Sequence, residues 1–167
     1  MNIDLELCAS NALTWAMARR GTSDYATRCL AFVEDAIERS NGIEIFGGDD
    51  AAESAALYDA AANSGIAPRG ALVYFRSVGE LFGERRNWGH VGLSLGDSRV
   101  IHAWDQVRID DVADMDSLPP APGWEPLAAV GWVPLRRVLR RCRPRSYSDE
   151  DAAIVAERMQ SARFGQR

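Results

Sequence analysis

The chain has 167 residues, of which 47% are hydrophobic and 26% charged, as expected for a single globular domain. Its net charge of −5 argues against general affinity for nucleic acid or anionic membranes. No apolar run in the sequence reaches the ~18 residues of a membrane span. Asp4 and Glu6 stand where a signal peptide would be basic, so we expect no secretion signal and a chain that is cytoplasmic as synthesised.

Apolar residues recur at helical spacing in the amino-terminal part of the chain, as in Leu5, Cys8 and Leu13. The pattern predicts helices over residues 3–20, 27–40 and 51–63. The expected caps are Asp24 or Thr27 at the start of the second helix, Asn41 and Gly42 at its end, and Asp49 or Asp50 at the start of the third.

The pattern then changes to short segments rich in β-branched and aromatic residues, separated by turn residues. Strands are expected over residues 70–75, 90–95, 99–104, 107–110 and 129–135. Helices followed by strands predict an α+β domain over residues 1–145, with a mainly antiparallel sheet of about five strands. Residues 114–126 are expected to form a proline-rich surface loop, and residues 146–167 a carboxy-terminal helical tail.

Three cysteines cannot all pair, and their spacing is not that of a zinc site, so we expect a reducing compartment and neither a metal nor a cofactor. Cys29 falls in the first turn of the second predicted helix, where free amide groups and the helix dipole favour a thiolate. Near an imidazolium such a thiol pKa falls from about 8.5 into the range ~3.5–7.5. Cys29 also shares an apolar stripe with Phe32 and Ala36, so simple core packing is an alternative.

The two histidines, His90 and His102, lie on two consecutive predicted strands. Because side chains alternate along a strand, the histidines share a face only if the connecting loop has an odd length. We expect an odd loop over residues 96–98. Gly92, next to His90 on that face, is expected to let the cysteine helix approach the sheet closely. A thiol activated by an imidazole that another group orients is the arrangement of a cysteine nucleophile.

The segments "RCLAFVEDA", "PRGALVYF", "GHVGLSLGDSRVIHAW" and "VGWVPL" resemble the NlpC-type papain-like cysteine peptidases and their CHAP-domain relatives, over about residues 25–135. The resemblance implies a papain-like fold in which Cys29 is the nucleophile, His90 the general base and His102 the orienting residue. Backbone N–H groups near the cysteine would contribute to the oxyanion hole. It also implies a bacterial cell-wall hydrolase that cleaves an amide bond, most simply in a peptidoglycan stem peptide.

The sequence departs from the common family pattern at three points. The cysteine stands in "RCLA" instead of "DCSG", and Ala71 replaces the usual aspartate of the following strand. The tyrosine that often precedes the cysteine by about a dozen residues has no match, since Tyr25 lies only four residues ahead. These differences concern substrate recognition more than the Cys–His–His set.

Four further residues are candidates for substrate binding, namely Tyr25, Trp88, Trp104 and Asp105. Asp105 is also an alternative to His102 as the orienting group. The arginine-rich segment 136–145 is interpreted as a solvated face, with binding of an anionic polymer as the alternative. Without a signal peptide, a wall substrate implies phage-borne delivery or a non-classical export route. Two other hypotheses remain: an amidase or acyltransferase of the same fold that acts outside the wall, and a non-catalytic binding module.

Overall fold

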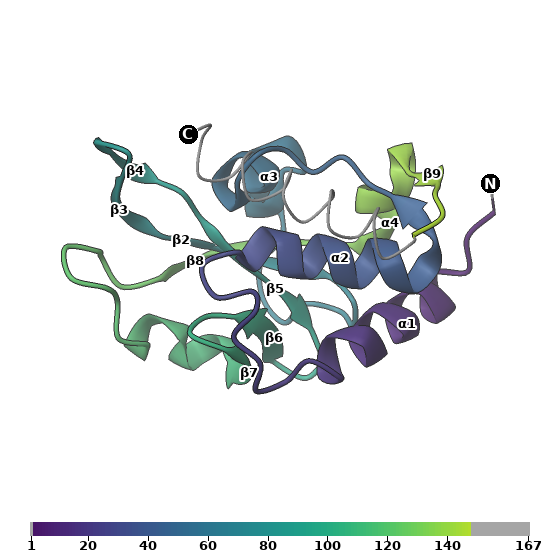
Figure 1. Ribbon diagram of the computed structural model, residues 1–167, viewed down its shortest axis with the longest axis horizontal. Coiled ribbons are helices and arrows are strands. Elements are labelled where there is room, and N and C mark those ends of the chain that lie inside the picture. Colours follow the sequence, from purple (N-terminus) through teal and green to yellow (C-terminus); the bar gives the residue numbers. More distant parts are fainter. Residues whose placement is uncertain (1, 148–167) are drawn as a thin grey trace.

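The computed structural model describes residues 2–147 and places helices against one face of a five-stranded antiparallel sheet (Figure 1). The strand order is β7-β6-β5-β2-β8. The helices are α1 (Leu5–Met17), α2 (Cys29–Asn41), α3 (Ala51–Leu57) and α4 (Leu135–Val138), with 3-10 turns at Ala60–Ala62, Val112–Ser117 and Leu139–Arg141. The strands are β1 (Ile43–Glu44), β2 (Leu72–Arg76), β3 (Val78–Leu81), β4 (Glu84–Asn87), β5 (His90–Ser94), β6 (Arg99–Ala103), β7 (Val107–Asp111), β8 (Ala128–Val133) and β9 (Arg143–Pro144). The predicted α+β class and antiparallel sheet are confirmed.

Helix α2 is the central helix, packed between α1 and the sheet and buried from Leu30 to Glu38. It ends as predicted at Gly42, whose φ of 61° lies in the left-handed region. The expected cap by Thr27 or Asp24 is wrong, because Arg28 is the residue before the helix and no side chain caps it. Residues 25–28 form a turn, with the Arg28 N–H donating to the Tyr25 carbonyl, so the helix starts one residue later than a Thr27 cap would require.

Helix α3 begins as predicted after Asp50, whose carboxylate accepts a hydrogen bond from the Glu53 N–H. It is shorter than the expected 51–63, because Asp59 adopts a left-handed φ of 57° and breaks the helix before the 3-10 turn Ala60–Ala62. Helix α1 is likewise shorter than 3–20 and is capped by Asp4. Within residues 2–147, no helix has the length and apolar character needed to cross a membrane.

The two faces of the sheet belong to different cores. Tyr74, Val91 and Ile101 face α1 and α2 in the main core. The opposite face carries a second core of Ala67, Ala71, Val73, Phe75, Val100, Met115, Leu118 and Leu127. Residues 114–126 therefore differ from the expected surface loop, since part of this segment is helical and its apolar side chains cover the second face.

The hairpin of β3 and β4 was not expected from the sequence. Its strands carry mostly polar, half-exposed side chains, and its two-residue turn is Phe82-Gly83. The Glu125 N–H donates to the Val78 carbonyl, so a distant segment supports it. Figure 1 shows this hairpin and the loop before β8 projecting from the same end of the molecule.

The chain returns to the helices at its carboxy-terminal end. Strand β9 pairs with β1, and the Tyr147 hydroxyl donates to the Ile43 carbonyl.

Leu135 and Val138 are buried while Arg136 and Arg140 are exposed, as expected for the arginine-rich segment. The predicted tail helix lies outside the described residues apart from positions 146 and 147.

The register between β5 and β6 confirms the odd loop. Leu93 lies opposite Ile101 and Ser94 opposite Val100, which leaves residues 96–98 as the loop. His90 and His102 therefore share one sheet face. Gly92 serves a different purpose from the one expected, because a Cβ there would lie 2.3 Å from Val100 Cγ2 and 2.9 Å from the His102 Cβ, not against the cysteine helix.

We predict that Gly92→Ala lowers the free energy of unfolding by about 1–3 kcal/mol, because the added methyl group overlaps Val100 and His102. Urea unfolding followed by circular dichroism measures this change. Val100→Ala removes the nearest overlapping atom, so the double variant should lose less stability than the two single changes added together. Additive losses would contradict the assignment of Gly92 as space for its cross-strand neighbours.

Candidate active site

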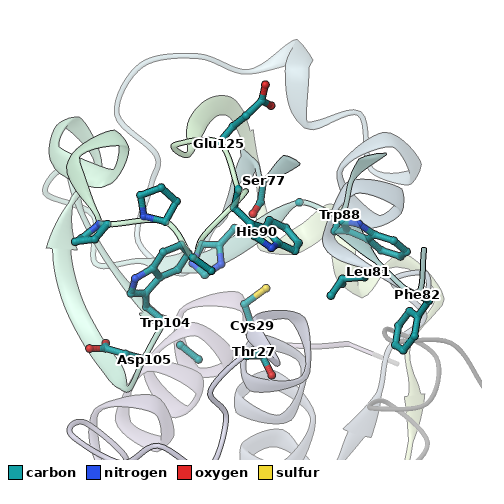
Figure 2. Close-up of a pocket in the computed structure, with 16 residues that line it drawn as sticks. Thr27, Cys29, Ser77, Leu81, Phe82, Trp88, His90, Trp104, Asp105 and Glu125 are labelled. Atoms are coloured by element: carbon teal, nitrogen blue, oxygen red, sulfur yellow. The ribbon is translucent and has the colours of Figure 1, made fainter. Parts of the chain in front are cut away.

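A pocket of about 710 Å³ opens at the end of the sheet where β5 begins and β6 ends. Cys29 and His90 both line it. Figure 2 shows the two residues next to each other in the middle of the pocket, with Trp104 on one side and Trp88 on the other. The residue types predicted for nucleophile and base are thus brought together from two elements that are far apart in the sequence.

Cys29 is the first residue of α2 and is half-buried. No side chain forms a capping hydrogen bond at the start of this helix, where the positive end of the helix dipole lies next to the thiol. The preceding Thr27 also lines the pocket and has a φ of 66°, an unusual conformation for a β-branched residue. Such strain is typical of backbone that positions a functional group.

Behind His90 runs a chain of hydrogen-bonding groups on one face of the sheet. His90 Nε2 lies 2.8 Å from His102 Nδ1, and His102 Nε2 lies 2.9 Å from Asp110 Oδ2. Arg108 closes the chain with a two-pronged contact, donating from Nε to Asp110 Oδ2 at 2.6 Å and from its terminal nitrogen to Oδ1 at 3.0 Å. Four side chains from β5, β6 and β7 are therefore aligned toward the pocket.

This chain determines which nitrogen of each imidazole carries the proton. Asp110, as a carboxylate, only accepts, so His102 holds its proton on Nε2 and leaves Nδ1 as an acceptor. His90 then donates from Nε2 to that Nδ1. The remaining nitrogen of His90, Nδ1, carries a lone pair, which is the state that a proton acceptor for a thiol requires.

Burial controls the protonation of the whole group. It lowers the pKa of His90 and, together with the neighbouring imidazole, that of His102, although Asp110 opposes the shift at His102. At Asp110 burial works against ionisation, but hydrogen bonds from Arg108 and His102 outweigh it and hold the carboxyl pKa below its usual value. Two neutral imidazoles on an ionised carboxylate are the resting state that follows.

Asp110 was not among the residues predicted from the sequence, which offered Asp105 as an alternative to His102 for orienting the general base. Asp105 is exposed and pairs with Arg108 at 3.5 Å, while the carboxylate that contacts His102 is that of Asp110. The signal was available in the β6–β7 register, because His102 lies opposite Arg108 and Val100 opposite Asp110, which places all four side chains on one face. The alternative that Asp105 takes the place of His102 beside His90 is not supported, because His90 Nε2 contacts His102 Nδ1.

Three of the four residues predicted to bind substrate lie in the pocket lining. Trp88, Trp104 and Asp105 line the pocket. Tyr25 is not among the described residues that line it: its hydroxyl donates to Asp35 Oδ2 at 2.5 Å and its ring packs against Trp15 and Phe32. Tyr25 stabilises the approach to α2, so it is corrected from a pocket residue to a structural one.

No cluster of three or more histidine, cysteine, aspartate or glutamate side chains within residues 2–147 has the geometry to hold a metal ion. None of the three cysteines, all of which lie in this range, forms a disulfide. The pocket presents the Cys29 thiol together with the buried imidazole of His90.

Residues 17–117, more than half of the chain, match the NlpC/P60 family. The chain belongs to the NlpC/P60 family. The match includes Cys29, His90, His102 and Asp110, and it agrees with the helices and antiparallel sheet of the fold. Members of this family are generally hydrolases of the peptidase and amidase type that act on peptidoglycan-related substrates. No curated protein matches the chain.

We predict that Asp110→Asn slows alkylation of Cys29 by iodoacetamide at pH 7 about tenfold or more, because an amide no longer enforces the His102 tautomer and the basic Nδ1 of His90. Mass spectrometry of the labelled peptide measures the rate. Asp105→Asn is the matched control, since it removes a carboxylate that also contacts Arg108 but leaves His102 undisturbed. Equal losses in the two variants would contradict the role given to Asp110.

A second prediction concerns stability against pH. Burial lowers the native-state pKa of His102, so the unfolded chain binds a proton below pH ~6.5 that the native state excludes, and stability falls as pH falls. Between pH 7 and pH 5 this effect of one histidine amounts to about 2 kcal/mol. Urea unfolding at both pH values should therefore show a smaller drop in His102→Gln than in the wild type.

Burial raises the pKa of Glu38 to about 7, so Glu38 makes the native state more stable as pH falls. This contribution is present in both proteins and cancels in the comparison. Identical drops in wild type and His102→Gln would show that burial does not lower the native-state pKa of His102.

Proposed function

We propose that this protein is a cysteine hydrolase that cleaves an amide bond of a peptidoglycan stem peptide, with Cys29 as nucleophile, His90 as general base and His102 as orienting residue. The observation that carries the proposal is the His90–His102–Asp110 hydrogen-bond chain, which leaves His90 Nδ1 basic in the pocket that Cys29 lines. Membership of a hydrolase family supports the reaction class, and the peptidoglycan-related substrates of the family support the choice of substrate.

The reaction begins with transfer of the Cys29 thiol proton to His90 Nδ1. Because burial disfavours an isolated imidazolium at His90, the proton is stable there only beside an anion, and the new thiolate is that anion. Proton transfer and formation of the ion pair are therefore one event. His102 accepts the hydrogen bond from the imidazolium Nε2–H, and Asp110 supports His102 in turn.

The thiolate then attacks the amide carbonyl and forms a tetrahedral intermediate. Backbone N–H groups at the start of α2, beside Cys29, would donate to its oxyanion. The His90 imidazolium protonates the leaving amine as the carbon–nitrogen bond breaks, which leaves a thioester on Cys29. A water molecule deprotonated by His90 attacks the thioester, releases the carboxylic acid and restores the thiol.

The test is the pH dependence of iodoacetamide alkylation at Cys29, read by mass spectrometry in the wild type and in His90→Ala. We expect rapid labelling with a midpoint well below ~8.5, and a midpoint shifted upward in His90→Ala. Cys8 is an internal control, since its side chain is 2% exposed and burial raises its pKa to about 11. Labelling of Cys29 as slow as that of Cys8 and unchanged by His90→Ala would favour a non-catalytic binding module.

Turnover is tested with purified stem-peptide fragments. Cys29→Ala should abolish release of new amino groups, whereas Cys8→Ala should retain it, because Cys8 is buried in the main core. A reactive Cys29 without activity on wall fragments would move the substrate outside the wall and favour an amidase or acyltransferase of this fold.

A further inference from the structure

The part of the pocket beyond the thiol is walled by apolar side chains. Its lining comes from the β3–β4 hairpin and from the loop before β8, and includes Leu81, Phe82, Trp88, Pro119, Pro120 and Trp124. Figure 2 shows Leu81, Phe82 and Trp88 grouped on one side of Cys29. Aromatic walls of this kind are typical of sites that bind apolar groups.

The two walls are joined by hydrogen bonds and by an aromatic contact. The Glu125 N–H donates to the Val78 carbonyl at 2.9 Å, and Arg85 donates to the Gly123 carbonyl at 2.8 Å. The Trp124 ring packs directly on Gly79, where a Cβ would overlap it. The cleft is therefore preformed, which reduces the entropy lost when a ligand binds.

Phe82 is placed at the tip of the hairpin against local preference. Its φ is 52°, and positions of this kind in two-residue hairpin turns favour asparagine, aspartate or glycine. The side chain is nevertheless a large aromatic that is 59% exposed and lines the pocket. A strained, exposed aromatic at the rim of a cleft indicates a binding role, since folding alone does not require it.

The charges around the cleft have one sign. Asp105 and Glu125 are the charged residues among the described side chains that line it; both are exposed carboxylates, and Asp105 also pairs with Arg108 at 3.5 Å. The neighbouring Arg86 stacks on the Trp88 ring and is paired with Asp50 at 2.9 Å, and Arg85 is held by a backbone carbonyl. A carboxylate entering this cleft would meet apolar walls and like charge.

We propose that the cleft selects an amide substrate with an apolar group beside the scissile bond and no free carboxylate in the cleft. This inference rests on the proposed function and narrows its substrate class. Stem peptides whose carboxylates are amidated satisfy the condition, as do N-acyl amides, whereas stem peptides with free carboxylates near the scissile bond do not. Burial of the apolar group of the substrate supplies the attraction, and repulsion from Asp105 and Glu125 disfavours substrates with a free carboxylate.

Two thiol reagents of matched length test the proposal on the full-length protein. N-hexyl-iodoacetamide presents an apolar chain, and 6-(iodoacetamido)hexanoic acid presents a similar chain that ends in a carboxylate. Each rate at Cys29 is divided by the rate of the same reagent with glutathione, which removes intrinsic reactivity. We expect the corrected rate to be about tenfold higher for the hexyl reagent. Equal corrected rates, or a faster carboxylate reagent, would overturn the proposal.

Variants of the aromatic wall residues show which side chains produce the selectivity between the two reagents. Phe82→Ala and Trp88→Ala should each reduce the ratio of the two corrected rates severalfold. Ile66→Ala is the matched control, because Ile66 is an exposed apolar residue, 70% accessible, that does not line the cleft. An equal reduction in all three variants would assign the selectivity to something other than the aromatic walls.

A measurement without thiol chemistry separates this inference from the proposed function. In Cys29→Ser, N-hexylacetamide should give a saturable change in tryptophan fluorescence at lower concentration than 6-acetamidohexanoate, since Trp88, Trp104 and Trp124 line the cleft. If the neutral amide binds selectively but Cys29 of the wild type is unreactive, the inferred selectivity of the cleft stands and the proposed hydrolase activity is wrong. If Cys29 is reactive but neither assay shows selectivity, the proposed hydrolase activity stands and the inferred selectivity of the cleft is wrong.

Discussion

The arrangement of the site depends on the parity of one loop. The three-residue loop 96–98, between Leu95 and Arg99, places His90 and His102 on the same face of the sheet, where their ring nitrogens lie 2.8 Å apart. A loop shorter or longer by one residue would turn one imidazole into the main core beneath α2. Gly92 belongs to the same constraint, because the absence of a side chain there provides the volume that His102 and Val100 fill.

The loop parity has a chemical consequence because the histidines are buried. A buried imidazole resists protonation, so the direction of each hydrogen bond is set by the group at the end of the chain, the Asp110 carboxylate held by Arg108. The carboxylate lies two hydrogen bonds away from His90 and still decides which of its nitrogens is basic. Electrostatic control at a distance of this kind requires a rigid scaffold, which three adjacent antiparallel strands provide.

The sheet also separates the hydrogen-bonded histidines from the apolar walls of the cleft. Strands β5, β6 and β7 carry the histidines and their partners, while the β3–β4 hairpin and the loop before β8 form the apolar walls of the cleft. The walls are joined to each other by hydrogen bonds and by the contact of Trp124 with Gly79. Changes in the walls can therefore alter the substrate without disturbing the imidazoles, which is a common way for one fold to serve several reactions.

Local periodicity in the sequence was enough to predict the α+β class and most strand positions, whereas the grouping of Cys29 with His90 and His102 was implied by the family resemblance. Three features were settled by the packing of the folded chain: Asp110 contacts His102, Tyr25 is not among the described residues that line the pocket, and residues 78–87 form a hairpin. Those outcomes depend on cross-strand register and on contacts between segments distant in sequence, such as Val78 with Glu125. Local propensity contains neither kind of information, since it is the packing of the folded chain that selects among partners of the same residue type.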